Sequence, residues 1–121
     1  MAETISQDLE SRPLATNEKL ILIGSSGGGT VAVESLDLLQ TKGIYVDQVI
    51  LRGSPVQELI LQNVGEVDYI TSNFDYYYSV DVNPFDDVTV QKYKMNFWGH
   101  VPPNANTSKQ IADLIVNLVA H

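Results

Sequence analysis

The chain contains no cysteine among its 121 residues and only two histidines. Without thiols it can form neither disulfides nor zinc–thiolate sites, and thiol catalysis is excluded. Basic residues are also scarce, since 15 acidic side chains stand against seven Lys and Arg and give a net charge of −8. Binding to a nucleic-acid backbone or to an anionic membrane needs clustered positive charge, so the composition argues against both kinds of partner.

Long apolar runs are missing as well, and residues 1–10 have neither the basic nor the apolar region of a secretory signal. We therefore expect a soluble, cytoplasmic protein. With 44% hydrophobic and 18% charged residues, the composition is that of an ordinary globular domain. The length predicts a single domain at residues 19–121, preceded by a polar arm or poorly ordered lead-in at residues 1–18.

Apolar residues recur in patterns that predict alternating strands and helices. The continuous run Leu20–Ile23 is typical of a strand buried on both faces of a parallel sheet. Residues Thr30–Lys42 are expected to form a helix that stops at Gly43. Its apolar stripe consists of Ala32, Leu36 and Leu39, with Val31 and Leu38 widening it. A second strand is expected at Asp47–Leu51, broken by Gly53-Ser54-Pro55.

The next segments continue this alternation. Pro55 is expected to open a short helix through Leu61, which Gly65 ends. Residues Val67–Ser72 predict the third strand. A long loop is expected at residues 73–87, because they combine Asn, Asp and Pro with three consecutive tyrosines.

The last segments complete an α/β pattern. Residues Val88–Trp98 predict a fourth strand, whose alternation changes phase and indicates a bulge near Lys92 or a strand that begins there. The final helix follows a capping box at Thr107–Gln110. Its apolar residues recur three and four apart, at Ile111, Leu114, Ile115, Leu118 and Val119. This order predicts a three-layer α/β sandwich around a short, mainly parallel four-stranded sheet.

The segment most indicative of chemistry is Gly24-Ser25-Ser26-Gly27-Gly28, a G-x-S-x-G sequence between the first strand and the first helix. On such a turn this pattern is typical of the nucleophile elbow of serine hydrolases, with Ser26 as the nucleophile. A serine nucleophile needs a base and an orienting acid. His100 follows the fourth strand, Asp75 follows the third, and His121 is a poor candidate at the end of the chain. Three further acidic residues remain candidates for the acid: Asp81, Asp86 and Asp87.

These features together resemble the carboxyl-terminal half of a lipase- or esterase-like α/β-hydrolase. The match rests on the elbow, on the strand and turn Val49–Val56, on Asp75 after the next strand, and on Gly99-His100 before the last helix. The resemblance implies hydrolysis of an ester, thioester or related acyl bond of a small molecule, with no cofactor. It also implies that the Gly27 N–H binds the oxyanion.

The chain departs from that family upstream of the elbow. The family takes its second oxyanion donor from a loop after an earlier strand, whereas residues 1–18 contain no glycine. We therefore expect an incomplete site, which is either inactive because this donor is missing or completed by a donor from another chain. The alternative is a small non-catalytic or phosphate-binding α/β domain, because glycine-rich turns before helices also bind phosphate through backbone N–H groups. Such a domain would use its exposed sheet edge for assembly.

Self-association is expected under both interpretations. The final helix alone cannot cover one face of a four-stranded sheet, and large exposed apolar patches usually mark interfaces. We predict a homodimer or higher oligomer when the molar mass is measured by light scattering at micromolar concentration. A monomeric mass under those conditions would contradict this prediction.

Overall fold

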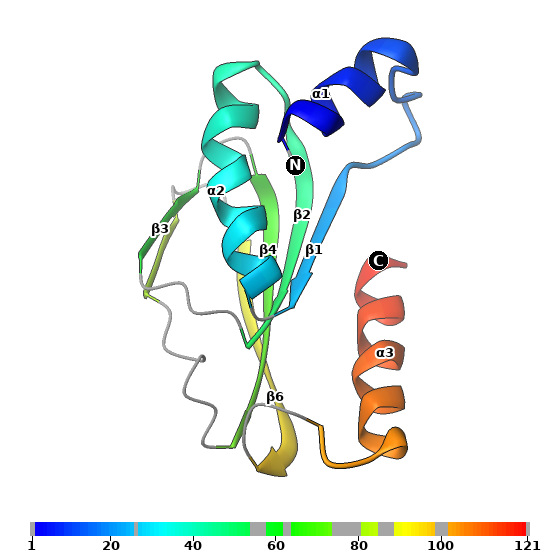
Figure 1. Ribbon diagram of the computed structural model, residues 1–121, viewed down its shortest axis with the longest axis vertical. Helices are drawn as coiled ribbons and strands as arrows, with labels where there is room; N and C mark the ends of the chain where they lie inside the picture. The colour runs from blue at the N-terminus through cyan, green and yellow to red at the C-terminus, as the bar shows by residue number, and fades with distance from the viewer. Residues whose placement is uncertain are drawn as a thin grey trace.

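The computed structural model describes residues 2–25, 27–53, 58–61, 64–73, 81–84, 89–98 and 102–120. These residues form α1 (Ala2–Ser11), β1 (Ile21–Ser25), α2 (Gly27–Thr41), β2 (Val46–Arg52), β3 (Glu58–Leu61), β4 (Val64–Asn73), β5 (Asp81–Pro84), β6 (Thr89–Trp98) and α3 (Ala105–Val119). Figure 1 shows α1 and α2 on one side of the main sheet and α3 on the other. The predicted three-layer α/β architecture is confirmed.

The main sheet has four parallel strands in the order β1-β2-β4-β6. Helix α2 connects β1 to β2, as a parallel pair requires. A separate parallel pair joins β3 to β5. The predicted helix through Leu61 is therefore wrong, and β5 lies within the expected loop at residues 73–87. The short apolar run Leu59-Ile60-Leu61 is compatible with either structure, and only its partner strand decides between them.

The larger hydrophobic core lies between the sheet and α2. Ala32, Leu36 and Leu39 are buried there against residues of β2 and β4, which confirms the predicted stripe. The predicted widening is wrong, because Val31 is 46% exposed and Leu38 is 57% exposed. Gly43 ends the helix as expected, in the left-handed conformation with φ 71°.

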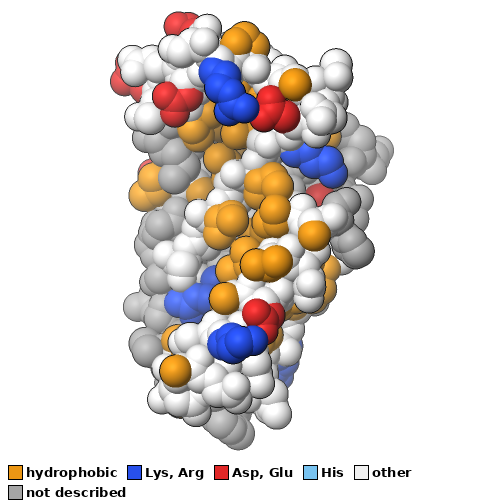
Figure 2. All heavy atoms as spheres, turned by 90° about the vertical axis from the view of Figure 1, so that its right-hand side faces the viewer, with side chains coloured by type: hydrophobic (Ala, Val, Ile, Leu, Met, Phe, Trp, Pro, Cys, Tyr) orange, Lys and Arg blue, Asp and Glu red, His pale blue; other side chains and the backbone are white. Residues whose placement is uncertain are grey.

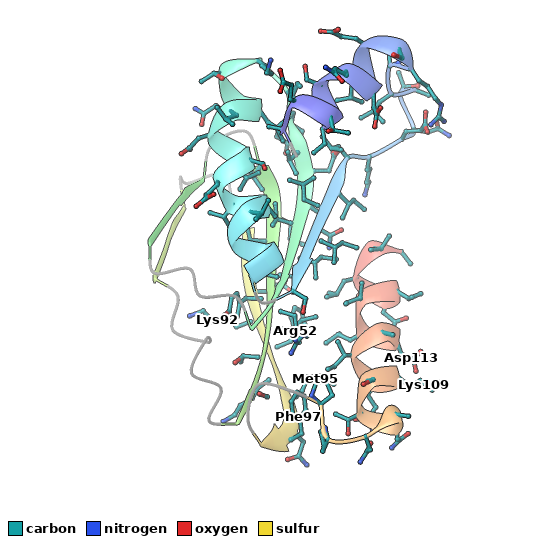
Figure 3. The ribbon with its side chains drawn as sticks, in the orientation of Figure 1. Arg52, Lys92, Met95, Phe97, Lys109 and Asp113 are labelled. Atoms are coloured by element: carbon teal, nitrogen blue, oxygen red, sulfur yellow. The ribbon has the colours of Figure 1, made fainter. Side chains whose placement is uncertain are left out.

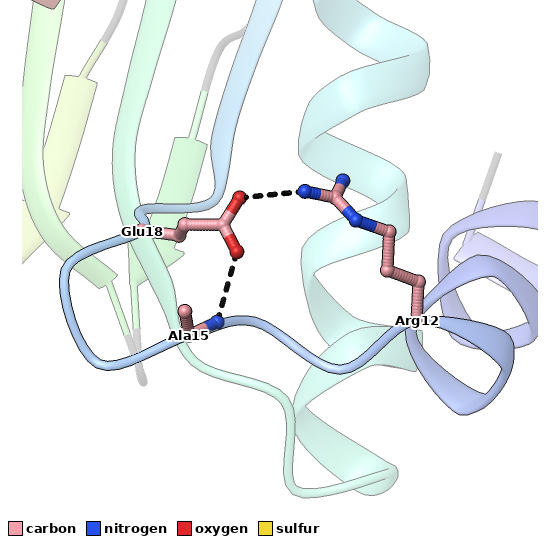
Figure 4. A network of polar contacts seen from close by, with 3 residues as sticks. All are labelled: Arg12, Ala15 and Glu18. Carbon is pink, nitrogen blue, oxygen red and sulfur yellow. Dashed lines mark hydrogen bonds and ion pairs between the residues drawn. The ribbon is translucent and has the colours of Figure 1, made fainter.

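The expectation of an arm or poorly ordered lead-in at residues 1–18 is wrong for its first part, because Ala2–Ser11 forms helix α1. Its inner side buries Ala2 and Ser6, and Ile5 packs beside them against the α2 core. These positions have helical spacing, but two of the three side chains are too small to give a strong periodic signal. A turn then leads into β1 (Figure 4), in which Glu18 accepts hydrogen bonds from the Ala15 backbone and from Arg12, both at 3.0 Å. These two contacts lower the pKa of the Glu18 carboxyl.

Two predictions, the burial of the first strand and the role of Gly65, are wrong because of how the strands are placed next to one another. β1 is an outer strand of the described sheet, so Ile23 is 50% exposed instead of buried as predicted. Gly65 lies inside β4 and does not end a helix. A Cβ atom there would lie 2.7 Å from the Asp47 carbonyl oxygen, so the close approach of β2 requires glycine.

The predicted bulge near Lys92 is also wrong. β6 pairs with β4 without a break from Thr89 to Met95, and the register shifts only between Ser72 and Asn73. Val90 pairs with Val67 of the α2 core, whereas Tyr93 pairs with Ile70 beneath α3. The change of apolar parity therefore reflects a sheet that is covered on both faces.

Among the described elements, only helix α3 covers the other face. Its N-cap is Asn104, whose Oδ1 accepts a hydrogen bond from the Thr107 N–H at 2.9 Å, so the predicted capping box lies inside the helix. Ile111 and Leu118 are buried, as the predicted stripe requires, but Val119 at its end is 39% exposed. Figure 2 shows hydrophobic side chains gathered along this side of the molecule. None of the helices in the described ranges has the length and apolarity needed to cross a membrane.

The sheet face beneath α3 mixes apolar residues with polar ones. Ile50 and Ile70 pack against Leu118, whereas Asp68 is fully buried between them in the register of the sheet. Tyr93 lies at the border of this face. Desolvation raises the pKa of the Tyr93 hydroxyl, and the nearby carboxylates of Asp68 and Glu66 raise it further.

The contribution of the α2 core can be tested with two adjacent leucines. We predict that Leu39→Ala lowers the free energy of unfolding by about 2–5 kcal/mol, because the buried side chain leaves a cavity. The control Leu38→Ala should change it by less than about 0.5 kcal/mol, since that side chain is largely exposed. Urea unfolding followed by circular dichroism measures both values. Equal losses in the two variants would contradict the described burial.

The raised pKa of Tyr93 predicts how the stability of the fold changes at alkaline pH. Because its pKa is raised in the folded state, the unfolded chain loses this proton first as the pH rises. The stabilising contribution is complete below the ordinary tyrosine pKa of about 10 and is lost as the pH passes through the folded value. We expect stability to fall more steeply above that pH in the wild type than in Tyr93→Phe. The free energy of unfolding is measured by urea titration at pH values below and above the tyrosine pKa. The same change with pH in the wild type and in Tyr93→Phe would disprove the shift.

Candidate functional site

The G-x-S-x-G segment lies between a strand and a helix, as the elbow interpretation requires. β1 ends at Ser25 and α2 begins at Gly27. Ser26 itself lies outside the described residues. As the first residue of α2, Gly27 carries one of the N–H groups that have no partner within the helix. The amino-terminal end of a helix also carries positive partial charge. The position after β1 is therefore suited to hold a developing negative charge.

Arg52 adds a full positive charge beside this turn. It ends β2 next to the end of β1, and its Nε–H donates a hydrogen bond to the Ser25 Oγ at 2.8 Å. Figure 3 shows Arg52 at this end of the strands, close to the start of α2. Gly53 follows in a left-handed conformation, with φ 52°, and its N–H donates to the Ile70 carbonyl at 3.0 Å. Because that conformation strongly favours glycine, the strand ends sharply after Arg52.

No sequence motif indicated Arg52 as a functional residue. The available signal was its position as the last residue of the strand that follows the elbow helix. At the carboxyl edge of a parallel sheet, that position places a side chain next to the preceding strand's end.

The strands of the sheet end at different levels. Ser25 is in register with Arg52, then Ile70, and then Tyr93. β4 continues beyond that level to Asn73 and β6 continues to Trp98, and these two end residues are paired. The segments that carry Asp75 and His100 therefore leave from neighbouring strand ends.

Ser26 follows a strand on the opposite side of the sheet. β1 and β6 are separated by β2 and β4, which corresponds to about 14 Å between strand axes. A contact between Ser26 and His100 thus requires the chain after Trp98 to return across the strand ends. The described chain resumes at Pro102 and forms α3, which packs against Ile21 of β1 and Ile50 of β2. The contacting residues of α3 are Leu114, Ile115 and Leu118, which follow His100 by more than a dozen positions, so the contact does not place His100 relative to Ser26.

The remaining predicted site residues are placed only in part. Asp81 begins β5 in the two-stranded sheet and so does not follow a strand of the main sheet. The other predicted members of the site lie outside the described residues: Ser26, Asp75, Asp86, Asp87 and His100. The terminal His121 lies outside them too. What the structure brings together is the backbone of Gly27, the end of β1, and Arg52.

The chain was compared with protein-family models, curated proteins and solved structures. Nothing matches the chain among protein-family models, curated proteins or solved structures.

Proposed function

We propose that this protein is a serine hydrolase-like domain that cleaves an ester, thioester or related acyl bond. The observation that supports the proposal best is the turn between β1 and α2 at the carboxyl edge of a parallel sheet. A residue on such a turn presents its side chain at the edge, beside the amino-terminal end of the helix. Ser26 occupies that position in the sequence.

The proposed mechanism assigns one role to each member of the site. His100 removes the proton from Ser26 Oγ as that oxygen attacks the acyl carbon, and then donates it to the leaving group. A water molecule, deprotonated by His100 in turn, attacks the acyl-enzyme, and His100 returns the proton to Ser26 Oγ as the acid product leaves. Asp75 holds the imidazole in the required tautomer. The Gly27 N–H stabilises the oxyanion of the tetrahedral intermediate. The chemistry requires no cofactor.

Arg52 suggests how the site compensates for a missing oxyanion donor. Its guanidinium lies one residue from the nucleophile, where it is hydrogen-bonded to Ser25. A positive charge near the developing oxyanion lowers its energy in the transition state. We therefore include Arg52 in the proposed site as an electrostatic stabiliser, and a second copy of the chain is the alternative source of the second donor.

The second candidate function is binding of phosphate or another anion. The same pair of features supports it, namely the amino-terminal end of α2 and the Arg52 guanidinium. In this case Ser26 would act as a hydrogen-bond donor without becoming a nucleophile. The two candidates therefore differ in whether Ser26 reacts covalently.

Assembly is part of the proposal. β1 is an outer strand of the described sheet, and its residue Ile23 is half exposed. Val116 of α3, the helix that packs against Ile21 of β1, is 64% exposed. An outer strand next to exposed apolar side chains favours pairing with a second copy. We propose a homodimer formed on this side.

A fluorophosphonate probe tests the proposed nucleophile. We expect it to form a covalent adduct on Ser26, located by mass spectrometry of the digested protein. Ser26→Ala should abolish the adduct and lower the hydrolysis rate of p-nitrophenyl butyrate by about 10³-fold or more. The neighbouring variant Ser25→Ala is the matched control and should still be labelled, because only Ser26 is proposed to react.

Two results together would decide against hydrolysis and for anion binding. One is the absence of an adduct together with equal esterase rates in wild type and Ser26→Ala. The other is protection of the amides of residues 27–30 by inorganic phosphate in hydrogen exchange, with loss of that protection in Arg52→Ala. The second result would favour the anion-binding candidate.

A further inference from the structure

The outer edge of β1 carries backbone groups that point away from the sheet. Leu20, just before β1, donates its N–H to Asp47 Oδ2 of β2 at 2.8 Å, and its carbonyl accepts the Asp47 N–H at 2.9 Å. Because the backbone groups of a strand alternate between its two sides, Ile21, Ile23 and Ser25 direct theirs outward. No described strand lies on that side. β1 thus presents an open row of donors and acceptors.

The two outer strands of the main sheet differ in how their edges are protected. β6 carries the exposed side chains of Lys92, labelled in Figure 3, and Lys94. Lysines on an outer strand oppose pairing with another chain. β1 contains neither a charged residue nor a proline. Of the two edges, β1 is therefore the one suited to a partner strand.

Helix α3 extends this edge with an apolar surface. Leu114 lines a cleft together with residues of β4 and β6, so this flank of α3 faces those strands. Helical spacing places Ala112, Val116 and Val119 on the opposite flank, toward β1. The two valines are 64% and 39% exposed, and Ala112 is exposed as well. With the half-exposed Ile23, they give the edge an uncharged, apolar border.

A second copy of this chain is the occupant that fits this edge. It offers the same open strand and the same apolar flank, and neither adds to the repulsion between two chains of net charge −8. A two-fold axis normal to the sheet runs the two β1 strands antiparallel and leaves both α3 helices on one face. The register centred on Ile23 pairs every outward group, because Ile23 then faces its own equivalent and Ile21 faces Ser25 of the second copy.

This register determines which residue of the second copy lies beside the turn after β1. Ser25 faces Ile21 of the second copy, so continuing the register brings Lys19 of that copy next to Gly27, at the start of α2. Lys19 is then a diagonal neighbour of Ser25, about 7–8 Å away between Cα atoms and within reach of a long side chain. The equivalent Ser25 of the second copy lies about 13 Å further along the strand. The second copy therefore contributes Lys19, and its own helix end stays remote.

Lys19 and the candidate site share one face of the sheet. Lys19 is exposed and lines a cavity with Leu118 of α3, which places its side chain on the α3 face. Alternation along β2 places Arg52 on the face of Ile50, also beneath α3. A two-fold axis normal to the sheet does not exchange the faces. The Lys19 ammonium of one copy can therefore approach the Arg52 guanidinium and Ser25 of the other, which are hydrogen-bonded at 2.8 Å.

We propose that two copies pair their β1 strands into one continuous sheet, and that Lys19 of each copy completes the candidate site of the other. Its ammonium group joins the Arg52 guanidinium and the amino-terminal end of α2 around one position. Such a group of positive charges stabilises an anion there, and Lys19 acts in the role that the second oxyanion donor has in hydrolases. The role of Lys19 rests on the proposed function, whereas the strand pairing rests on the open edge of β1 alone.

Hydrogen exchange of the full chain, followed by NMR, tests the strand pairing. We expect slow exchange of the outward amides of Ile21, Ile23 and Ser25 at concentrations where light scattering gives a dimer. Ile23→Lys should produce a monomer, because a lysine on an outer strand opposes pairing. In that monomer the amides of Ile21 and Ser25 should exchange at least about tenfold faster. The inward amides of Leu22 and Gly24 should stay slow, since β2 still pairs them.

Leu38→Lys is the matched control for this variant. Leu38 is 57% exposed, which is similar to Ile23 at 50%, but it lies on α2. The control should keep the mass of the dimer and the slow outward amides. A monomeric wild type, a dimeric Ile23→Lys, or equal exchange of the outward amides in these two proteins would overturn the pairing.

Cysteine cross-linking tests the register, because the native chain contains no thiol. A chain with both Lys19→Cys and Ser25→Cys is treated with a short bismaleimide, and the linked peptides are identified by mass spectrometry. Within one chain these positions lie about 20 Å apart along the strand, so a link between them joins two copies. The control chain combines Ser25→Cys with Lys42→Cys, at the far end of α2, and should give no link. Absence of the link from residue 19 to residue 25 would overturn the register.

The rate of fluorophosphonate labelling tests the role of Lys19. Lys19→Gln should keep the mass of the dimer and lower this rate about tenfold, whereas Lys42→Gln should leave it within about twofold. Ile23→Lys should show the same loss as Lys19→Gln, and the double variant no further loss, because Lys19 acts only across the dimer. A dimeric Lys19→Gln that is labelled as fast as the wild type would overturn this role.

Failure of the proposed hydrolase function has a different signature, namely no adduct in the wild type. In that case inorganic phosphate provides the readout for Lys19. Protection of the amides of residues 27–30 by phosphate should be lost in Lys19→Gln and kept in Lys42→Gln. Equal protection in both variants would overturn the contribution of Lys19, and no protection in the wild type would do the same.

Discussion

The structure depends on the need of an all-parallel sheet to be covered on both faces. Each parallel connection must cross from one end of the sheet to the other, but only α2 is a connecting helix here, because the described parts of the β2–β4 and β4–β6 connections are the strands β3 and β5. Here α1 and α2 cover one face and α3 covers the other. The first face is apolar and buries most of the core, whereas the second accommodates Gln48 and Asp68 beneath a single helix. The face beneath α1 and α2 therefore holds most of the hydrophobic core, whereas the face beneath α3 also buries polar side chains.

The direction of the strands separates two edges of opposite charge. At the carboxyl edge, the amino-terminal end of α2 and the Arg52 guanidinium create a positive environment at the end of β1. At the amino edge, Glu66, Asp68 and the carboxyl end of α3 create a negative one. Helices α2 and α3 cover opposite faces, so the positive and the negative region lie in different layers around the same sheet.

The sequence pattern correctly predicted those elements whose buried residues follow from the periodicity of nearby residues. The α2 stripe and the Gly43 stop were confirmed because a helix face and a left-handed residue follow from nearby residues alone. The predictions failed where a distant partner decides the structure. β3 forms because β5 pairs with it, and Gly65 is needed because the Asp47 carbonyl of β2 approaches it closely. At the candidate site, the strand and helix around Ser26 were predictable, but Arg52 beside Ser25 depended on the pairing of β1 with β2.

The sequence by itself determined the alternation of strands and helices, the composition that disfavours polyanionic partners, and the position of Ser26 between a strand and a helix. These properties follow from short-range periodicity and from turn chemistry. The tertiary structure decided which strands are outermost, how far each extends, and which polar side chains are buried beneath α3. Asp68 illustrates the difference, because one carboxylate in a strand acquires significance only when Gln48, Tyr93 and α3 enclose it. The register of the strands and the packing of helices on the sheet depend on contacts between residues far apart in the chain. No local sequence pattern encodes such contacts.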